Sequence, residues 1–144
     1  MKTVLFICTA NFYRSRFCEH WFNHLAQQQH LDWTATSRAV MSELGGGNLG
    51  PISPHALRGL LARGVPFPET FRDPMQLTEP DLRSAQHIIA LDEEEHRPFM
   101  ELRFAAWANK VTYWHVGDLH LKTMEEALAL ADRNVRELIQ QLAA

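Results

Sequence analysis

The sequence predicts an α/β fold in which a four-stranded parallel sheet carries helices on both faces. Short apolar runs rich in β-forming residues alternate with longer segments of helical periodicity. No hairpin turn signal separates any pair of these runs. Strands separated by helices form parallel sheets, and right-handed crossovers place the loops after the strands along one edge, where ligands bind. The chain has neither repeats nor a linker, so we expect a single domain over residues 1–144.

The first half of the chain predicts two strands and two helices in alternation. Residues 4–7 form an apolar strand, and a helix with one apolar face follows over residues 15–29. Residues 31–37 alternate apolar and polar side chains, which is typical of a strand. A Ser-Pro pair and a glycine bound a second helix over residues 53–64. The glycine-rich segment 45–50 lacks the GK[ST] ending of a nucleotide-binding loop, so we expect a surface loop there.

The second half predicts the other two strands and three further helices. Residues 78–83 indicate a short capped helix, and residues 86–91 indicate the third strand. The acidic run 92–95 predicts the start of another helix, because carboxylates complement the positive end of a helix dipole. Residues 111–116 predict the fourth strand, and residues 123–142 a long final helix.

The composition restricts the functional class. The chain is 46% hydrophobic and 22% charged, which fits one compact core, and its net charge of -3 argues against a general nucleic-acid or membrane-surface binder. No apolar run is long enough to span a bilayer, and the N-terminus does not resemble a signal peptide. Two cysteines without a disulfide-scaffold spacing suit the reducing cytoplasm. The eight histidines are scattered, so we expect solvated surface histidines rather than a metal site.

The loop between the first strand and the first helix carries the chemistry. Cys8 ends the strand, and Arg14 and Ser15 stand where the helix begins. Such a loop directs backbone N–H groups and the positive end of the helix dipole at one spot, where an anion binds. These groups and Arg14 favour the thiolate of Cys8, while the planar fork of Arg14 suits a tetrahedral oxyanion. A thiolate facing a bound phosphoryl group is the chemistry of a cysteine phosphatase; the alternative is a buried structural cysteine beside a surface arginine.

The Cys8-x5-Arg14-Ser15 pattern after an N-terminal strand resembles the low-molecular-weight protein tyrosine phosphatases. The resemblance implies their phosphotyrosine phosphatase I-like fold, with flavodoxin-like layering, and a metal-independent phosphomonoester hydrolase without cofactors. That enzyme would act as a protein tyrosine phosphatase through a cysteinyl-phosphate intermediate. Its substrate would be a phosphorylated protein or a small aryl phosphate, and inorganic phosphate its product. The residues implied in phosphate binding are Thr9, Ala10, Asn11, Phe12, Tyr13, Arg14 and Ser15.

The resemblance also implies roles for individual side chains near Cys8. The amide of Asn11 would tie down the strained backbone of the loop, because asparagine tolerates left-handed angles better than most residues. The hydroxyl of Ser15 would hydrogen-bond the cysteine sulfur and ease its departure from the intermediate. Ordinary capping is the alternative for both Asn11 and Ser15, since Ser15 stands where the helix begins. Asp92 matches another family position near the pocket, although capping of the following helix explains it equally well.

Two aspartates compete for the general acid that protonates the leaving group. Asp73 is followed by Pro74, the pair that the resembling family uses for its acid. Asp118 is followed by Leu119 instead, but it comes after the fourth strand and before the final helix, where the family places that acid. We therefore expect Asp118 to be the acid, with a simple turn-capping role as its alternative.

Several positions depart from the resembling family. Ala10 stands where many members carry glycine, so the loop must avoid angles that only glycine reaches comfortably. Tyr13 replaces a cysteine often found beside the arginine, and Arg16 replaces a proline. Leu119 and His120 stand where paired aromatic residues usually follow the acid. These departures concern the preference for phosphotyrosine as substrate, whereas the expectation of phosphatase chemistry rests on Cys8 and Arg14.

Two other functions compete with phosphatase activity. A thiol-dependent arsenate reductase of the same fold would need resolving cysteines near the third strand, and Cys18 is the only other cysteine of the chain. Cys18 belongs to the apolar face of the first helix, so we expect it to pack in the core. A phosphate- or phosphotyrosine-binding module with weak or no turnover is the alternative from another class. It is motivated by Ala10, Arg16 and the missing proline after Asp118.

Overall fold

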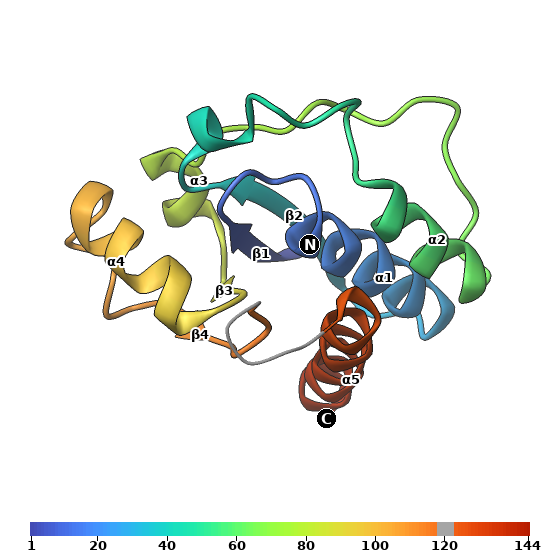
Figure 1. The fold of residues 1–144 in the computed structure, drawn as a ribbon. Coiled ribbons are helices and arrows are strands. Elements are labelled where there is room, and N and C mark those ends of the chain that lie inside the picture. Colours follow the sequence, from blue (N-terminus) through green and yellow to red (C-terminus); the bar gives the residue numbers. More distant parts are fainter. Residues whose placement is uncertain (118–122) are drawn as a thin grey trace.

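A parallel sheet of four strands forms the centre of the computed structural model, which describes residues 1–117 and 123–144 (Figure 1). The strands run in the order β2-β1-β3-β4, and each neighbouring pair is parallel. Their bounds are β1 Lys2–Cys8, β2 Trp33–Ala39, β3 His87–Ala90 and β4 Thr112–Tyr113. The predicted α/β fold with an all-parallel sheet is therefore confirmed.

Helices cover both faces of this sheet, as the sequence predicts (Figure 1). One face carries α1 (Arg14–Gln28), α2 (Pro54–Ala62) and α5 (Met124–Ala143), and the other carries α3 (Glu79–Ser84) and α4 (Glu93–Arg103). Side chains of β1 alternate between two cores: Val4 and Phe6 pack toward α1, and Leu5 and Ile7 toward α4. All four are fully buried, because a central parallel strand is covered on both sides.

Capping residues set the start of four helices. Ser53 Oγ accepts a hydrogen bond from the backbone N–H of His55 at 3.1 Å, and Thr78 forms a capping box with Asp81. Asp92 caps α4, and Thr123 caps α5. The predicted helix bounds therefore agree with the structure to within about two residues at these N-termini.

Three local features differ from the sequence predictions. The fourth strand has two residues rather than six, because the backbone of Trp114 and Val116 continues only as single hydrogen bonds to Ala90 and Leu91. A short 3-10 helix, η1 (Ser42–Gly45), lies at the start of the predicted glycine-rich loop. His96 is fully buried, so the expectation of surface histidines is wrong for this residue. Its ring nitrogens have partners inside the protein, which compensate for the loss of water.

The topology locates the site before any side chain is considered. From β1 the chain crosses to β2 on one side, and β3 then pairs with β1 on the other side. The crevice beyond the carboxyl ends of β1 and β3 is therefore a topological switch point, where open α/β sheets bind ligands. Cys8 is the last residue of β1.

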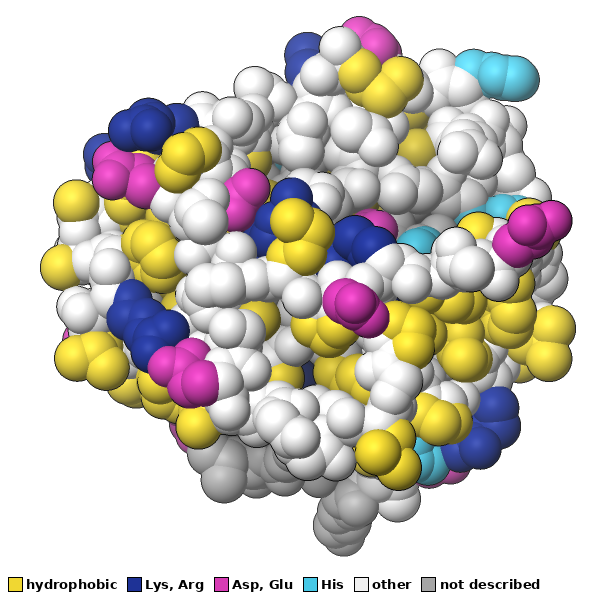
Figure 2. All heavy atoms as spheres, turned by 90° about the horizontal axis from the view of Figure 1, so that it is seen from above, with side chains coloured by type: hydrophobic (Ala, Val, Ile, Leu, Met, Phe, Trp, Pro, Cys, Tyr) yellow, Lys and Arg dark blue, Asp and Glu magenta, His cyan; other side chains and the backbone are white. Residues whose placement is uncertain are grey.

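The described surface carries mixed charge. On the face drawn in Figure 2, Lys and Arg side chains lie beside Asp and Glu side chains, without an extended patch of one sign. Within the described residues, no helix combines the length and the apolar character that crossing a membrane requires.

Candidate active site

The loop from Cys8 to Arg14 is attached to its neighbours through its own carbonyl groups. The carbonyls of Cys8 and Thr9 accept hydrogen bonds from the backbone N–H groups of Val40 and Met41, at 3.0 and 2.9 Å. The carbonyl of Phe12 accepts from the N–H of Ser53 at 2.9 Å. The link after β2 and the start of α2 therefore both hold the loop in place.

Asn11 adopts the left-handed conformation that its role in the loop requires, with φ of 55°. Its buried Nδ2 donates to Ser15 Oγ at 2.9 Å and to Ser37 Oγ at 2.8 Å. Its Oδ1 accepts from Arg72 Nη1 at 3.0 Å and from the backbone N–H of Met75 at 3.1 Å. These four bonds hold a strained backbone residue in a single position. Ala10 is not among the described residues with positive φ, which agrees with the absence of glycine there.

The sulfur of Cys8 lies in contact with a hydroxyl. Cys8 Sγ and Ser15 Oγ are 2.9 Å apart, and both residues are buried. Asn11 donates to the same Ser15 oxygen, which leaves the serine hydroxyl hydrogen available to point at the sulfur. A hydroxyl donor stabilises a thiolate more than a thiol.

Among the described residues, two segments other than its own helix hold Arg14. Its Nη1 donates to the carbonyl of Val116, just beyond β4, at 2.9 Å. Its Nη2 donates to Glu95 Oε2, in the first turn of α4, at 2.7 Å. The arginine side chain is 11% exposed, so these contacts form largely away from bulk water and are correspondingly strong.

Glu95 is a carboxylate that the acidic run had suggested only as a partner of the helix dipole. Its Oε2 accepts from the hydroxyl of Thr9 and from Arg14, and it lies 3.1 Å from His96 Nε2. Burial raises the pKa of Glu95, but hydrogen bonds from His96, Arg14 and Thr9 outweigh burial and hold that pKa well below its usual range. Glu95 is therefore an anion throughout the neutral pH range.

Asp92 has the capping role that the sequence offered as one of its two alternatives. Its Oδ2 accepts from the backbone N–H of Glu95 at 3.2 Å and so caps α4. The carboxylate also lies against Gly117, where a Cβ atom would come within 2.3 Å of Oδ2. Only glycine fits at this close approach, which brings the segment after β4 next to the carboxyl end of β3.

Arg16 is a buried cation beside the loop. It is fully buried, and its Nη1 donates to the carbonyl of Pro51 at 2.9 Å. Among the described residues, none accepts a hydrogen bond from its Nε or Nη2. Burial and the nearby Arg72 lower the pKa of Arg16, whereas Glu19 and Cys8 favour its charge. Arg16 thus adds positive charge near the cysteine.

A pocket of about 320 Å³ opens at this loop. It is lined by Cys8, Thr9, Ala10, Phe12, Tyr13, Arg14, Asn48, Ser53, Pro54, His55 and Met124. The ring of Tyr13 lies edge-on to the ring of His55, with centroids 6.4 Å apart. Cys8 and Arg14 thus line the same pocket as several aromatic and apolar side chains.

The two candidate acids fare differently. Asp73 is exposed and is absent from the described lining of the pocket. Its neighbours Arg72 and Met75 contact Asn11, so this segment braces the loop from outside. Asp118 lies outside the described residues, so its assignment stays a prediction.

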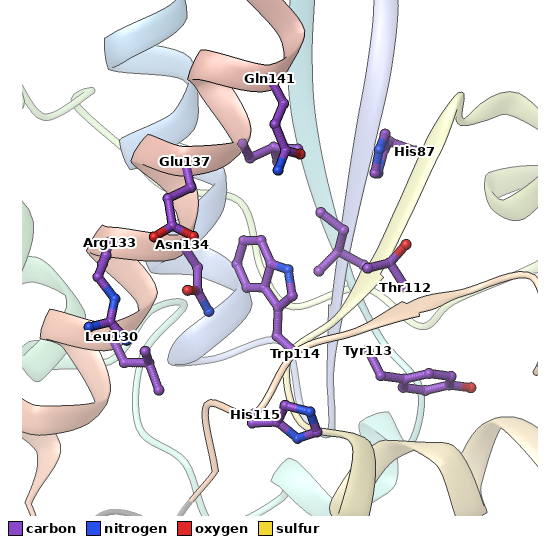
Figure 3. A pocket seen from close by; sticks show the side chains of 12 residues that line it. His87, Thr112, Tyr113, Trp114, His115, Leu130, Arg133, Asn134, Glu137 and Gln141 are labelled. Atoms are coloured by element: carbon purple, nitrogen blue, oxygen red, sulfur yellow. The ribbon is translucent and has the colours of Figure 1, made fainter.

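A second, larger cavity lies away from the cysteine. It measures about 540 Å³ and separates the β4 end of the sheet from α5. Figure 3 shows the indole of Trp114 in this groove, facing Asn134 and Glu137 of α5, with His87 on the opposite side. It contains neither Cys8 nor Arg14, so the chemistry predicted from the sequence belongs to the smaller pocket.

The structure brings together most of the predicted site and adds residues that the sequence analysis missed. Cys8, Asn11, Arg14 and Ser15 form one connected cluster. The added residues are Ser37, Arg72, Glu95 and His96. Glu95 and His96 follow the end of β3, so the rule that sites form at the carboxyl ends of strands could have found them. Within the described residues, no group of three or more His, Cys, Asp or Glu side chains is placed to hold a metal ion.

Comparison with known proteins identifies the family. The family model described as "Low molecular weight phosphotyrosine protein phosphatase" matches residues 3–144. The chain therefore belongs to the low molecular weight phosphotyrosine protein phosphatase family. None of the curated proteins matches it in sequence.

Solved structures share the fold at low sequence identity. A low molecular weight protein tyrosine phosphatase from T. tengcongensis has 22% identity and a TM-score of 0.78, over 98% of this chain and 99% of that one. The YwlE arginine phosphatase with a phosphorylated active-site serine has 20% identity and a TM-score of 0.78, over 98% and 95% of the two chains. Vibrio vulnificus Wzb in complex with benzylphosphonate has 16% identity and a TM-score of 0.77, over 97% and 98%.

Proposed function

We propose that this protein hydrolyses phosphotyrosine in proteins, or small aryl phosphates, through a cysteinyl-phosphate intermediate and without a metal ion. The observation that carries the proposal is the single pocket that holds Cys8 and Arg14 on a loop braced by Asn11 and Ser15. Membership of the phosphatase family supports the same chemistry. Inorganic phosphate is the product.

The proposed reaction has two steps. The thiolate of Cys8 attacks phosphorus in line, the S–P bond forms, and the bond from phosphorus to the phenolic oxygen breaks. Arg14 and the backbone N–H groups of residues 9–15 hold the equatorial oxygens, and Asp118 protonates the departing phenolate. Asp118 then takes a proton from water, which attacks phosphorus and releases the thiolate. The Ser15 hydroxyl, 2.9 Å from the sulfur, stabilises that thiolate as it leaves.

The walls of the pocket favour an aromatic leaving group. Phe12, Tyr13, Pro54 and Met124 offer apolar and aromatic surface to a phenyl ring. Among the described residues, no carboxylate lines the pocket, whereas the guanidinium of a phosphoarginine substrate would call for one. Phosphoarginine is the second candidate substrate, because a solved structure of the same fold is an arginine phosphatase. We therefore expect a phosphotyrosine peptide to be hydrolysed faster than a matched phosphoarginine peptide.

Hydrolysis of p-nitrophenyl phosphate by the parent and by Cys8→Ser tests the mechanism. The serine hydroxyl stays protonated, so the variant should lose turnover but keep phosphate binding. Substantial turnover in Cys8→Ser would exclude the covalent route. A parent that binds phosphate without turnover would instead favour the alternative of a binding module.

The leaving group distinguishes the two candidate acids. Asp118→Asn should slow aryl phosphates with poor leaving groups by about 10²–10⁴-fold, and good leaving groups much less. The contact of Arg14 with Val116, two residues before Asp118, supports this assignment. Asp73→Asn is the matched control and should leave both rates near those of the parent. A leaving-group dependence in Asp73→Asn would transfer the role to that residue.

The second cysteine supports hydrolysis over arsenate reduction. Cys18 is fully buried, and burial raises the pKa of its thiol well above the usual value. Such a thiol is a poor resolving nucleophile. Both cysteines are free, which fits the cytoplasmic location that we propose.

A further inference from the structure

We propose that Glu95 is the positioning residue of Arg14: it fixes the plane of the guanidinium that grips the phosphoryl group. The inference rests on the phosphatase function proposed above. It gives a specific task to one carboxylate of the acidic run 92–95, which the sequence analysis had explained by the helix dipole alone.

Two contacts at different nitrogens define the orientation of Arg14. Nη2 donates to Glu95 Oε2 at 2.7 Å, and Nη1 donates to the carbonyl of Val116 at 2.9 Å. A guanidinium is rigid and planar, so fixing both terminal nitrogens fixes its whole plane. Val116 is a backbone anchor that substitutions cannot remove. Glu95 is an anchor that depends on a side chain.

Glu95 is itself held in place by a chain of hydrogen bonds. The backbone N–H of Asp92 donates to His96 Nδ1 at 3.0 Å. With Nδ1 accepting, we assign the imidazole hydrogen to Nε2, which lies 3.1 Å from Glu95 Oε2 and 3.2 Å from Thr9 Oγ1. The hydroxyl of Thr9 also donates to Glu95 Oε2. The carboxylate therefore connects α4 to Thr9 and Arg14, which lie near the two ends of the loop that follows β1.

The charge of Glu95 suits an orienting role and not a proton-transfer role. Burial raises its pKa, but donation from His96, Arg14 and Thr9 holds that pKa well below the usual range. The group therefore stays ionised at neutral pH and cannot deliver a proton to a leaving group. A fixed anion orients the arginine without changing its own state during the reaction.

The contact between Glu95 and Arg14 could also have the opposite effect on phosphate binding, and the experiment distinguishes the two effects. Glu95 could compete with the phosphoryl group for Arg14, because two anions beside one cation repel each other. Removal of the charge would then strengthen phosphate binding. If Glu95 orients Arg14 instead, removal of the charge weakens phosphate binding and slows turnover. The sign of the change decides between the two.

The experiment compares Glu95→Gln with Glu93→Gln in the same helical turn. Glu93 pairs with Arg97 at 2.9 Å, and among the described residues its carboxylate makes no hydrogen bond or ion pair with the loop, so its variant controls for the lost charge. Turnover of an aryl phosphate and calorimetric affinity for inorganic phosphate are measured in both. We expect Glu95→Gln to lower kcat about 10²-fold, as a misplacement of about 1 Å does, and to weaken phosphate binding. Glu93→Gln should match the parent.

A double-mutant cycle shows whether the effect passes through Arg14. In an Arg14→Lys background no planar fork remains to be oriented, so Glu95→Gln should change kcat by less than about threefold. An undiminished effect there, or tighter phosphate binding by Glu95→Gln alone, would overturn the proposal. Glu95→Asp, which keeps the charge but shortens the side chain, should show the same loss. Parent-like activity in that variant would also overturn it.

The two readouts separate this proposal from the proposed function. A parent without turnover would reject the phosphatase function. Calorimetric phosphate affinities of the parent, Glu95→Gln, Arg14→Lys and the double variant would still test whether Glu95 controls phosphate binding through Arg14.

Discussion

Asn11 determines the geometry of the candidate site from a single strained position. Its φ of 55° is unfavourable for an ordinary side chain, and its amide makes four hydrogen bonds. The partners come from α1, β2 and the segment before α3, so one side chain joins three parts of the chain to the loop. Pre-organisation of this kind lowers the cost of binding an anion.

Substitution of Asn11 should separate backbone strain from hydrogen bonding. We expect Asn11→Ala to lower the free energy of unfolding by about 3 kcal/mol, because buried donors lose partners and alanine is strained at positive φ. Asn11→Gly loses the same hydrogen bonds without that strain, so it should be about 1 kcal/mol more stable than Asn11→Ala. Urea unfolding of the three proteins measures both differences. Equal stabilities of the two variants would contradict the strain at this residue.

Single residues of the site differ in how far the sequence reveals them. Cys8, Arg14, Asn11 and Ser15 lie within one short motif, so their types and spacing identify them. Arg72 contacts Asn11 from 61 positions away, and nothing in its local pattern indicates that contact. The packing of the loops decides which distant residues become partners, and no local pattern in a single sequence reveals that packing.

At the scale of the elements, helix starts could be predicted well and strand lengths less well. Caps are local chemistry, and Ser53 stands where the sequence predicts one. Thr123, predicted as the first residue of the final helix, is its N-cap. The fourth strand is shorter than its apolar run, although the ring of Trp114 beyond it still packs against Phe6, with centroids 5.7 Å apart. The apolar character of a segment indicates that it is buried, but not how many of its residues pair with the neighbouring strand.

Asp132 joins three helical segments on one side of the sheet. On α5, its carboxylate accepts from Trp21 Nε1 of α1 at 2.8 Å and from Arg63 Nε at the end of α2 at 2.8 Å. Arg136 Nε donates to it at 2.7 Å. Burial raises the pKa of Asp132, but hydrogen bonds from Arg63, Arg136 and Trp21 outweigh it, so that the pKa is lowered.

The lowered pKa predicts how the stability of the helical layer depends on pH. A carboxyl with a lower pKa in the folded state stabilises the fold above its unfolded pKa of about 3.9, and this contribution is lost as the pH falls through the folded pKa. Asp132→Asn should therefore cost about 2 kcal/mol at pH 7 and progressively less below about pH 4. Urea unfolding at several pH values measures this, with Asp32→Asn as the exposed control. A deficit that stays constant down to pH 2 would contradict the prediction.

For the whole molecule, the sequence predicts the parallel sheet and its switch point, because alternating strands and helices permit few topologies. The fold is shared with solved structures at about 20% identity, such as the YwlE arginine phosphatase. The contacts that converge on the loop come from α4, α2, the end of β4 and the segment before α3. The site therefore depends on the folded state of the entire chain rather than on the loop alone.

This dependence predicts that phosphate stabilises the whole protein. A ligand that binds only the folded state adds about 2.7 kcal/mol to the free energy of unfolding at 100 times its Kd. Phosphate also stabilises proteins generally as an excluded salt. The Arg14→Lys variant controls for this general effect, and sodium chloride at equal ionic strength, without sulfate, controls for ionic strength. We expect Cys8→Ser to be stabilised by phosphate as much as the parent, and Arg14→Lys far less, in urea unfolding. Equal stabilisation of the parent and Arg14→Lys would show that phosphate acts on the solvent-exposed surface and not in the pocket beside Cys8.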